Sequence, residues 1–202
     1  MRKAYLIALV AGLAAGAHAQ NLLSNPGFES GALSPWTESD ATDGLGLFIG
    51  PVQSYFDLQP HSGSWFILDG AFGEGSDGDG ALDIMSQSVG TTAGKHYTFS
   101  FWAATDDTVG DNGIAAFVNG VDVSGQMTVP AIPDNGFYDY TQYSFDVLAT
   151  GATTTVGIGM RCPPAFIAVD DASFTENAVP EPASFAILGL GALALIRRRK
   201  QA

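Results

Sequence analysis

The stretch Lys95-His96-Tyr97-Thr98-Phe99-Ser100-Phe101-Trp102 decides the fold class of this chain. Successive side chains of a strand point to opposite faces, so Tyr97, Phe99 and Phe101 lie on one face. The other face carries His96, Thr98, Ser100 and Trp102. An aromatic face opposite a mostly polar face is typical of a strand that covers a core on one side. The stretch therefore predicts an antiparallel β-sheet.

The same alternation recurs between residues 20 and 178. Two runs repeat it clearly: 138–148, with Tyr143, Phe145 and Val147 on one face, and 153–161, with Val156, Ile158 and Met160. Further strands are predicted at 45–49, 64–68, 83–89, 113–119 and 166–174. Gly, Asp, Asn and Pro separate these runs, and helical periodicity is nearly absent. About eight to ten strands without intervening helices predict an all-β fold, a two-sheet antiparallel β-sandwich or jelly roll.

The N-terminus has the layout of a secretory signal peptide. Two basic residues precede an apolar stretch, residues 4–17, and the small-residue pattern Ala17-His18-Ala19 follows. We expect a signal helix at 1–19, with cleavage after Ala19, and a folded domain at 20–178. A retained membrane anchor is the alternative, and the apolar run is short for one.

The C-terminus carries a second targeting signal at 179–202. Val179-Pro180-Glu181-Pro182 leads into the apolar run 183–196, which ends at the basic cluster Arg197-Arg198-Arg199-Lys200. As a helix, these 14 residues would reach about 21 Å, against about 30 Å for a hydrocarbon core. This is a marginal membrane span, and the basic end favours the cytoplasmic side.

This order of parts resembles the PEP-CTERM sorting signal of Gram-negative bacteria. The resemblance covers about 24 residues and implies that an exosortase-type enzyme processes the tail near the Pro-Glu-Pro segment. It also implies export, transient anchoring in the inner membrane, and delivery to the cell surface or to the extracellular matrix, where polysaccharide and biofilm material accumulate. It describes a route and leaves the activity of the domain open.

The predicted domain is strongly acidic. Between residues 20 and 178 there are 20 acidic residues and two basic ones, Lys95 and Arg161, a formal charge of −18 against −13 for the whole chain. Such a surface repels nucleic acid and anionic lipid and favours divalent cations. We therefore expect no nucleic-acid partner. A solubilising acidic surface without a specific ligand is the alternative.

An ordered series of short motifs spans most of the domain. It begins with Asn25-Pro26-Gly27-Phe28-Glu29, continues with His61-Ser62-Gly63-Ser64 and the stretch quoted above, and ends with Asp170-Asp171-Ala172-Ser173-Phe174. The series resembles the galactose-binding-like jelly rolls, particularly carbohydrate-binding modules of the 4/9 type. We therefore expect an exported protein that binds polysaccharide or matrix glycan.

The resemblance implies two kinds of site. Many of these jelly rolls hold a structural Ca²⁺ where the first strand meets the last, and the matching positions are Glu29 and Asp170. The period-2 pattern places Asp170 on one face with Ala172 and Phe174. The alternative is that both carboxylates accept hydrogen bonds without a metal. Glycan binding in such modules uses aromatic platforms, for which Trp102 is the first candidate and Tyr140, Trp36 and Trp65 follow.

Catalysis has weak support in the sequence. No HExxH, GxSxG or Ser/His/Asp ordering is present, and paired carboxylates are the only other route to glycan hydrolysis. Cys162 is the only cysteine, so no disulfide can form within one chain, and we expect it to be buried and inert. We predict a non-catalytic protein. A purely structural surface protein and a small glycan-active enzyme are the alternatives.

Overall fold

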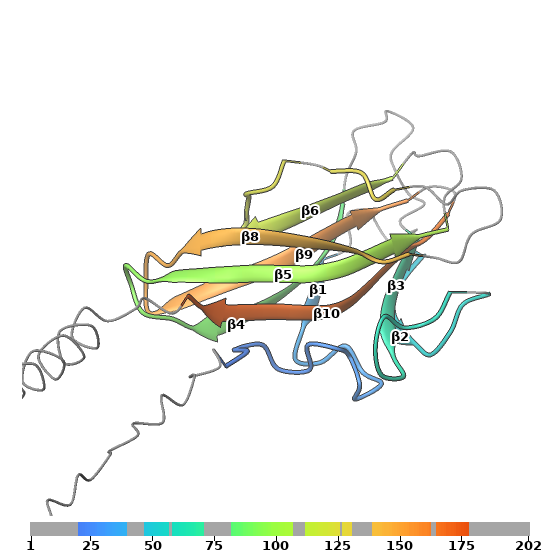
Figure 1. Cartoon of the computed structure of the whole chain (residues 1–202), viewed down its shortest axis with the longest axis horizontal. Helices are drawn as coiled ribbons and strands as arrows, with labels where there is room; N and C mark the ends of the chain where they lie inside the picture. The colour runs from blue at the N-terminus through green and yellow to red at the C-terminus, as the bar shows by residue number, and fades with distance from the viewer. Residues whose placement is uncertain are drawn as a thin grey trace, which may run out of the picture.

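A computed structural model describes residues 20–39, 47–56, 58–70, 82–106, 112–125, 127–130, 139–162 and 165–177. These residues form ten strands and their connections, with no helix among them. The strands lie in two antiparallel five-stranded sheets that pack face to face (Figure 1). The predicted two-sheet β-sandwich is confirmed.

The two sheets differ in strand order. The first runs β1 (Thr37–Ser39), β4 (Asp83–Gly90), β9 (Thr153–Arg161), β6 (Gly113–Val118) and β7 (Val121–Asp122). The second runs β2 (Leu47–Val52), β3 (Phe66–Gly70), β10 (Ile167–Glu176), β5 (His96–Thr105) and β8 (Thr141–Leu148). The chain changes sheet at most connections, as in jelly rolls.

The space between the sheets is filled as the alternation predicts. Tyr97, Phe99 and Phe101 of β5 are buried there, and Val156, Ile158 and Met160 of β9 face them from the other sheet. Tyr97 stacks on Phe174 of β10, with ring centroids 5.0 Å apart. Burial of each large apolar side chain contributes about 1.5–3 kcal/mol, so this layer drives formation of the sandwich.

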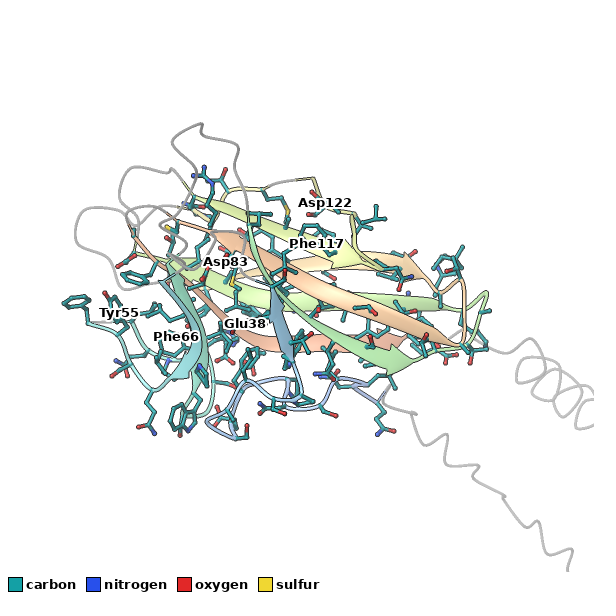
Figure 2. The ribbon with its side chains drawn as sticks, turned by 180° about the vertical axis from the view of Figure 1, so that it is seen from behind. Glu38, Tyr55, Phe66, Asp83, Phe117 and Asp122 are labelled. Carbon is teal, nitrogen blue, oxygen red and sulfur yellow. The ribbon has the colours of Figure 1, made fainter. Side chains whose placement is uncertain are left out.

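A smaller apolar cluster lies on the outer side of the second sheet. Its buried members come from three strands and the segment before β3: Leu58, Phe66, Leu68, Ala104 and Ala168. Figure 2 views the molecule from behind and labels Tyr55 and Phe66 at this end, and Phe117 and Asp122 on the first sheet. The segment that precedes β3 is therefore fastened over one end of the second sheet, beside Trp102.

Eight of the ten strands match the sequence prediction within a few residues. The two unpredicted strands, β1 and β7, are three and two residues long, and all of their side chains are exposed. No apolar alternation therefore marks them. Cys162 is buried, as expected.

The predicted signal helix and C-terminal apolar helix lie outside the described residues. So do the sorting residues Ala19, Val179, Pro180, Glu181, Pro182, Arg197, Arg198 and Arg199. Within the part of the chain that the structure describes, no helix is long and apolar enough to cross a membrane.

Candidate functional site

A β-bulge in β10 shapes the candidate site. Asp170 pairs with Trp102 of β5, and Ser173 pairs with Ser100, so β10 advances one residue more than its partner. The bulge contains Asp171, whose φ is 47°, and the amide of Ala172 donates to the Pro26 carbonyl at 2.9 Å. An extra residue exchanges the two faces of a strand.

The bulge corrects one expectation. Asp170 lies on the outer face, opposite Trp102, whereas Ala172 and Phe174 belong to the core between the sheets. A strict period of two had placed all three on one face. Asp170 is nevertheless fully buried, because the chain before β3 covers this part of the outer face.

The buried Asp170 carboxylate is held by backbone donors. Its Oδ2 accepts from the Ser62 amide at 3.1 Å, and its Oδ1 accepts from the Asp171 amide at 2.7 Å. Burial raises the pKa of Asp170 to about 6, although the two amide hydrogen bonds act in the opposite direction. The carboxylate form is therefore stabilised too little by its protein neighbours, which is the situation that a bound cation relieves.

Glu29 accepts hydrogen bonds from the backbone just after Ser62, in the segment that precedes β3. Its carboxylate accepts from the Ser64 amide at 2.9 and 3.0 Å and from the Trp65 amide at 3.0 Å. Gly63 has a φ of 65°, and a Cβ at this position would overlap the Glu29 carboxylate. The close approach of the backbone to Glu29 therefore requires a glycine.

Gly27 lies beside the Asp170 carboxylate and the Cγ methylene of Glu29, while the Glu29 carboxylate lies at Gly63. A Cβ built on Gly27 would lie 3.7 Å from Asp170 Oδ1, 3.3 Å from Asp171 Oδ1 and 3.8 Å from Glu29 Cγ. Ca²⁺ takes six to eight oxygen ligands. Both Asp170 oxygens and Glu29 Oε2 accept one amide hydrogen bond each and keep a lone pair, whereas Glu29 Oε1 accepts two. The described residues contain no group of three or more His, Cys, Asp and Glu side chains placed to hold a metal. Glu29 and Asp170 offer carboxylate oxygens of the kind that Ca²⁺ prefers, and backbone carbonyls would have to supply most of its ligands.

Trp102 and Tyr140 are brought together by a third ring, that of His61. The imidazole stacks on the Trp102 indole, with centroids 4.1 Å apart and planes at 18°, and meets Tyr140 edge-on at 5.3 Å. The Tyr140 hydroxyl donates to the Gln59 carbonyl at 2.9 Å. Burial, followed by the charges of Asp170 and Asp171, raises the pKa of Tyr140, so the phenol stays protonated.

The remaining tryptophans serve packing. Trp36 is 4% exposed and donates from Nε1 to the Asn25 carbonyl at 3.3 Å, so it has no face for a ligand. Trp65 lies against Gly31, where a Cβ would come within 3.0 Å of its ring. Among the tryptophans, Trp102 therefore remains the one candidate platform.

Polar side chains extend the outer face of the second sheet beyond Trp102. Cross-strand pairs bring Ser100 beside Ser144, and Thr98 beside Asp146. At the far end, His96 Nδ1 lies 2.7 Å from Asp146 Oδ2, and Asn177 donates to the other oxygen of Asp146 at 3.0 Å. The face is thus a row of hydroxyl and carboxylate groups that begins at an aromatic cluster.

The hydrogen-bond order at His61 does not suit nucleophilic catalysis. The Ser62 hydroxyl donates to Asp171 Oδ1 at 2.8 Å, and His61 Nδ1 lies 2.6 Å from Asp171 Oδ2. The carboxylate is between the hydroxyl and the imidazole, whereas activation of a serine requires the imidazole in the middle. The arrangement orients side chains and is suited to binding.

Two hollows of about 360 Å³ lie elsewhere on the molecule. One is lined by Leu22, Tyr97 and Glu176 among others, and the second by Ser24, Thr37 and Gln87 among others. Neither hollow is lined by His61, Trp102 or Tyr140.

The sequence alone did not identify His61 and Asp171 as site residues, and for Ser62 it suggested only a backbone carbonyl near a metal. His61 and Ser62 lie in a motif that carried the family resemblance, and Asp171 follows a predicted ligand directly. Their roles depend on the contact between a connecting segment and a bulge 108 to 110 positions away along the chain. Alternation within a strand carries no signal for such a contact.

Comparisons with known proteins support both the C-terminal sorting motif and the β-sandwich fold. The sequence model of the PEP-CTERM protein-sorting motif matches residues 178–200, which implies export and sorting to the cell surface. No curated protein matches the chain. The chain therefore combines a sorting motif with an all-β jelly-roll domain.

Several solved structures share the fold. TmCBM61, solved in complex with beta-1,4-galactotriose, is 21% identical with a TM-score of 0.55, over 79% of this chain and 100% of that chain. The CBM22-1 xylan-binding domain from Paenibacillus barcinonensis is 15% identical with a TM-score of 0.54, over 80% and 97%. A cleaved adhesin domain of Lys-gingipain from Porphyromonas gingivalis is 19% identical with a TM-score of 0.52, over 75% and 96%. At these identities the likeness establishes the β-sandwich fold.

Proposed function

We propose that this protein is an exported, non-catalytic module that binds neutral polysaccharide on the outer face of its second sheet. The observation that carries the proposal is the cluster of Trp102 and Tyr140 beside a row of polar side chains in which Ser144 and Asp146 are exposed. A sugar ring presents an apolar C–H face and a rim of hydroxyls. Aromatic rings with a few placed polar groups are complementary to both.

The charge of the domain favours a neutral ligand. Asp170 is the cross-strand neighbour of Trp102, Asp171 contacts His61, and Asp146 lies further along the face. The whole predicted domain carries a formal charge of −18. A polymer of uronic acids would be repelled by this field, whereas a neutral hexose or pentose chain would not. The ligands named for TmCBM61 and for the Paenibacillus domain, a galactotriose and xylan, are of this neutral kind.

Ca²⁺ forms the second part of the proposal. Glu29 and Asp170, with backbone carbonyls of the segment around Ser62 and Gly63, would hold the ion, which would supply the positive charge that buried Asp170 lacks. Its role would be structural, since it would join the N-terminal segment, the chain before β3 and the last strand.

The two ends of the chain complete the proposed route. Signal cleavage after Ala19 would release the domain from the export machinery, and an exosortase-type enzyme would process the tail near Val179-Pro180-Glu181-Pro182. Until then the apolar run would lie in the inner membrane of a Gram-negative cell, with Arg197, Arg198 and Arg199 on the cytoplasmic side. The domain would then enter the extracellular matrix.

The test is binding of the exported protein, recovered from producing cells, to a panel of neutral and uronate-containing polysaccharides. We expect binding to a neutral member and a loss of about tenfold in affinity for Trp102→Ala, which corresponds to about 1.4 kcal/mol. Phe56→Ala is the matched control, because Phe56 is an aromatic residue 81% exposed outside the cluster. If no polysaccharide binds, the protein is a structural surface component.

A further inference from the structure

His61 occupies the place that a ligand of Trp102 would be expected to take. Its ring covers one face of the indole at a centroid distance of 4.1 Å, and its own side chain is 29% exposed. The outermost ring of the cluster is therefore the imidazole. A sugar that approaches this side of the indole meets His61 first.

The position of His61 is fixed from two sides. Asp171 Oδ2 lies 2.6 Å from Nδ1, and its Oδ1 accepts from the hydroxyl of the next residue, Ser62, at 2.8 Å. On the other side, the Tyr140 hydroxyl donates a hydrogen bond to the Gln59 carbonyl at 2.9 Å. The segment 59–62 is thus fastened to β10 at one end and to Tyr140 at the other, with the imidazole between the indole and the phenol.

The hydrogen bond to Asp171 determines what His61 offers to a ligand. A carboxylate accepts hydrogen bonds, so Nδ1 carries the proton that it shares with Asp171. In the neutral ring, Nε2 is then an acceptor. No hydrogen bond to Nε2 is formed by the residues that the structure describes. In this neutral form, His61 combines a partly exposed ring with an acceptor at its edge.

We propose that His61 is the sugar-contacting residue of the cluster, that Trp102 supports it from behind, and that Asp171 is its positioning residue. The inference rests on the proposed function and refines it: a neutral pyranose packs on the exposed face of the imidazole and donates a hydroxyl hydrogen bond to Nε2. The neighbouring carboxylates of Asp170 and Asp171 disfavour a uronate at the same place.

The chain offers a matched control for this inference. His96 makes the same Nδ1 contact with a carboxylate, 2.7 Å to Asp146, on the same outer face, and no ring of the described residues stacks on it. We expect His61→Ala to weaken binding of the polysaccharide found for the wild type by about tenfold, and His96→Ala to change it by less than about twofold. His61→Phe, which keeps a stacked ring without Nε2, should lie between His61→Ala and the wild type.

The positioning role of Asp171 has a spectroscopic signature. Stacking on the indole shifts the imidazole C–H proton resonances of His61 to high field, and the two histidines between residues 20 and 178 can be assigned from His61→Ala and His96→Ala. Asp171→Asn should move the His61 resonances toward those of a free imidazole and weaken binding. Asp146→Asn should leave the His61 resonances unchanged.

The outcomes separate this inference from the proposed function. If the wild type binds no polysaccharide, both fall together. If the wild type binds and Trp102→Ala weakens binding, but His61→Ala binds as tightly or more tightly, then His61 is a removable cover and only the present inference is overturned. If Asp171→Asn leaves the high-field resonances and the affinity intact, the positioning role is overturned. Thermal unfolding of each variant checks that a loss of binding does not reflect a loss of folding.

Discussion

Gly63 shows how closely single residues are constrained at this site. Its φ of 65° and the nearness of the Glu29 carboxylate allow no side chain. We expect Gly63→Ala to lower the free energy of unfolding by about 2–3 kcal/mol, because the left-handed conformation costs about 1–2 kcal/mol and the carboxylate must also move. Urea unfolding at equilibrium measures the change.

Gly94 is the control for Gly63. Its φ is 80°, and a Cβ there would meet nothing within 4 Å. Gly94→Ala therefore carries the backbone cost alone, about 1–2 kcal/mol. Equal losses in the two variants would show that the Glu29 carboxylate does not restrict the segment at Gly63.

Asp170 is the residue on which the calcium proposal depends. We expect Ca²⁺ to raise the melting temperature of the wild type by about 5–10 °C at about 100 times its dissociation constant, because ligand binding at that ratio adds about 2.7 kcal/mol. Calorimetry in Ca²⁺ and in a chelator measures the shift.

Asp170→Asn should abolish most of the calcium-dependent shift, since it removes a charged ligand from the ion. Asp146→Asn is the control, because it makes the same chemical change on the same sheet face but away from Glu29 and Asp170. This variant should retain the calcium-dependent shift in melting temperature. A wild-type melting temperature that is identical in Ca²⁺ and in chelator would refute the metal site.

At the scale of the element, β5 serves both sides of the second sheet. One face supplies Tyr97, Phe99 and Phe101 to the core, and the other presents Thr98 and Trp102 to the outer surface. Phe99→Ala should therefore lower the free energy of unfolding by about 3–5 kcal/mol, since it leaves a cavity where the side chain was fully buried.

Thr98→Ala is the control within the same strand. It removes a partly buried hydroxyl that donates to Asn177 Oδ1 at 2.7 Å, for which we expect a loss of about 1 kcal/mol. Denaturant unfolding of both variants compares the two faces directly. Similar losses would mean that the two faces of β5 are not divided as the alternation indicates.

The last strand illustrates the limit of reasoning from periodicity. The sequence predicted β10 well in extent, and its alternation is correct on either side of Asp171. The bulge at Asp171 lies between these two parts of the strand, so the side chains that follow it have exchanged faces. Because of that exchange, the Asp170 side chain is buried under the chain before β3 and not between the sheets. A local pattern cannot reveal an extra residue that is set by pairing with a distant strand.

At the scale of the whole molecule, charge is the dominant feature. A formal charge of −18 between residues 20 and 178 opposes the compact state through repulsion among the carboxylates. In the presence of a chelator, the melting temperature should therefore rise as the salt concentration is raised from about 0.01 M to about 1 M, over which the Debye length falls from about 30 Å to about 3 Å. A melting temperature that falls in this range would show that attractive ion pairs outweigh the repulsion.

The sequence by itself determined the class of fold, the core faces of β5, β8 and β9, and the sorting motif at the C-terminus. These features are local, because alternation and composition are written in consecutive residues. The sequence also indicated Glu29, Asp170, Trp102 and Tyr140 through resemblance. Only the tertiary structure decided that His61 lies on Trp102, that Asp171 holds it, and that Asp170 faces outward. Those arrangements arise where a connecting segment packs on a bulged strand about 110 residues away, and such long-range contacts are set by chain packing and not by any local repeat.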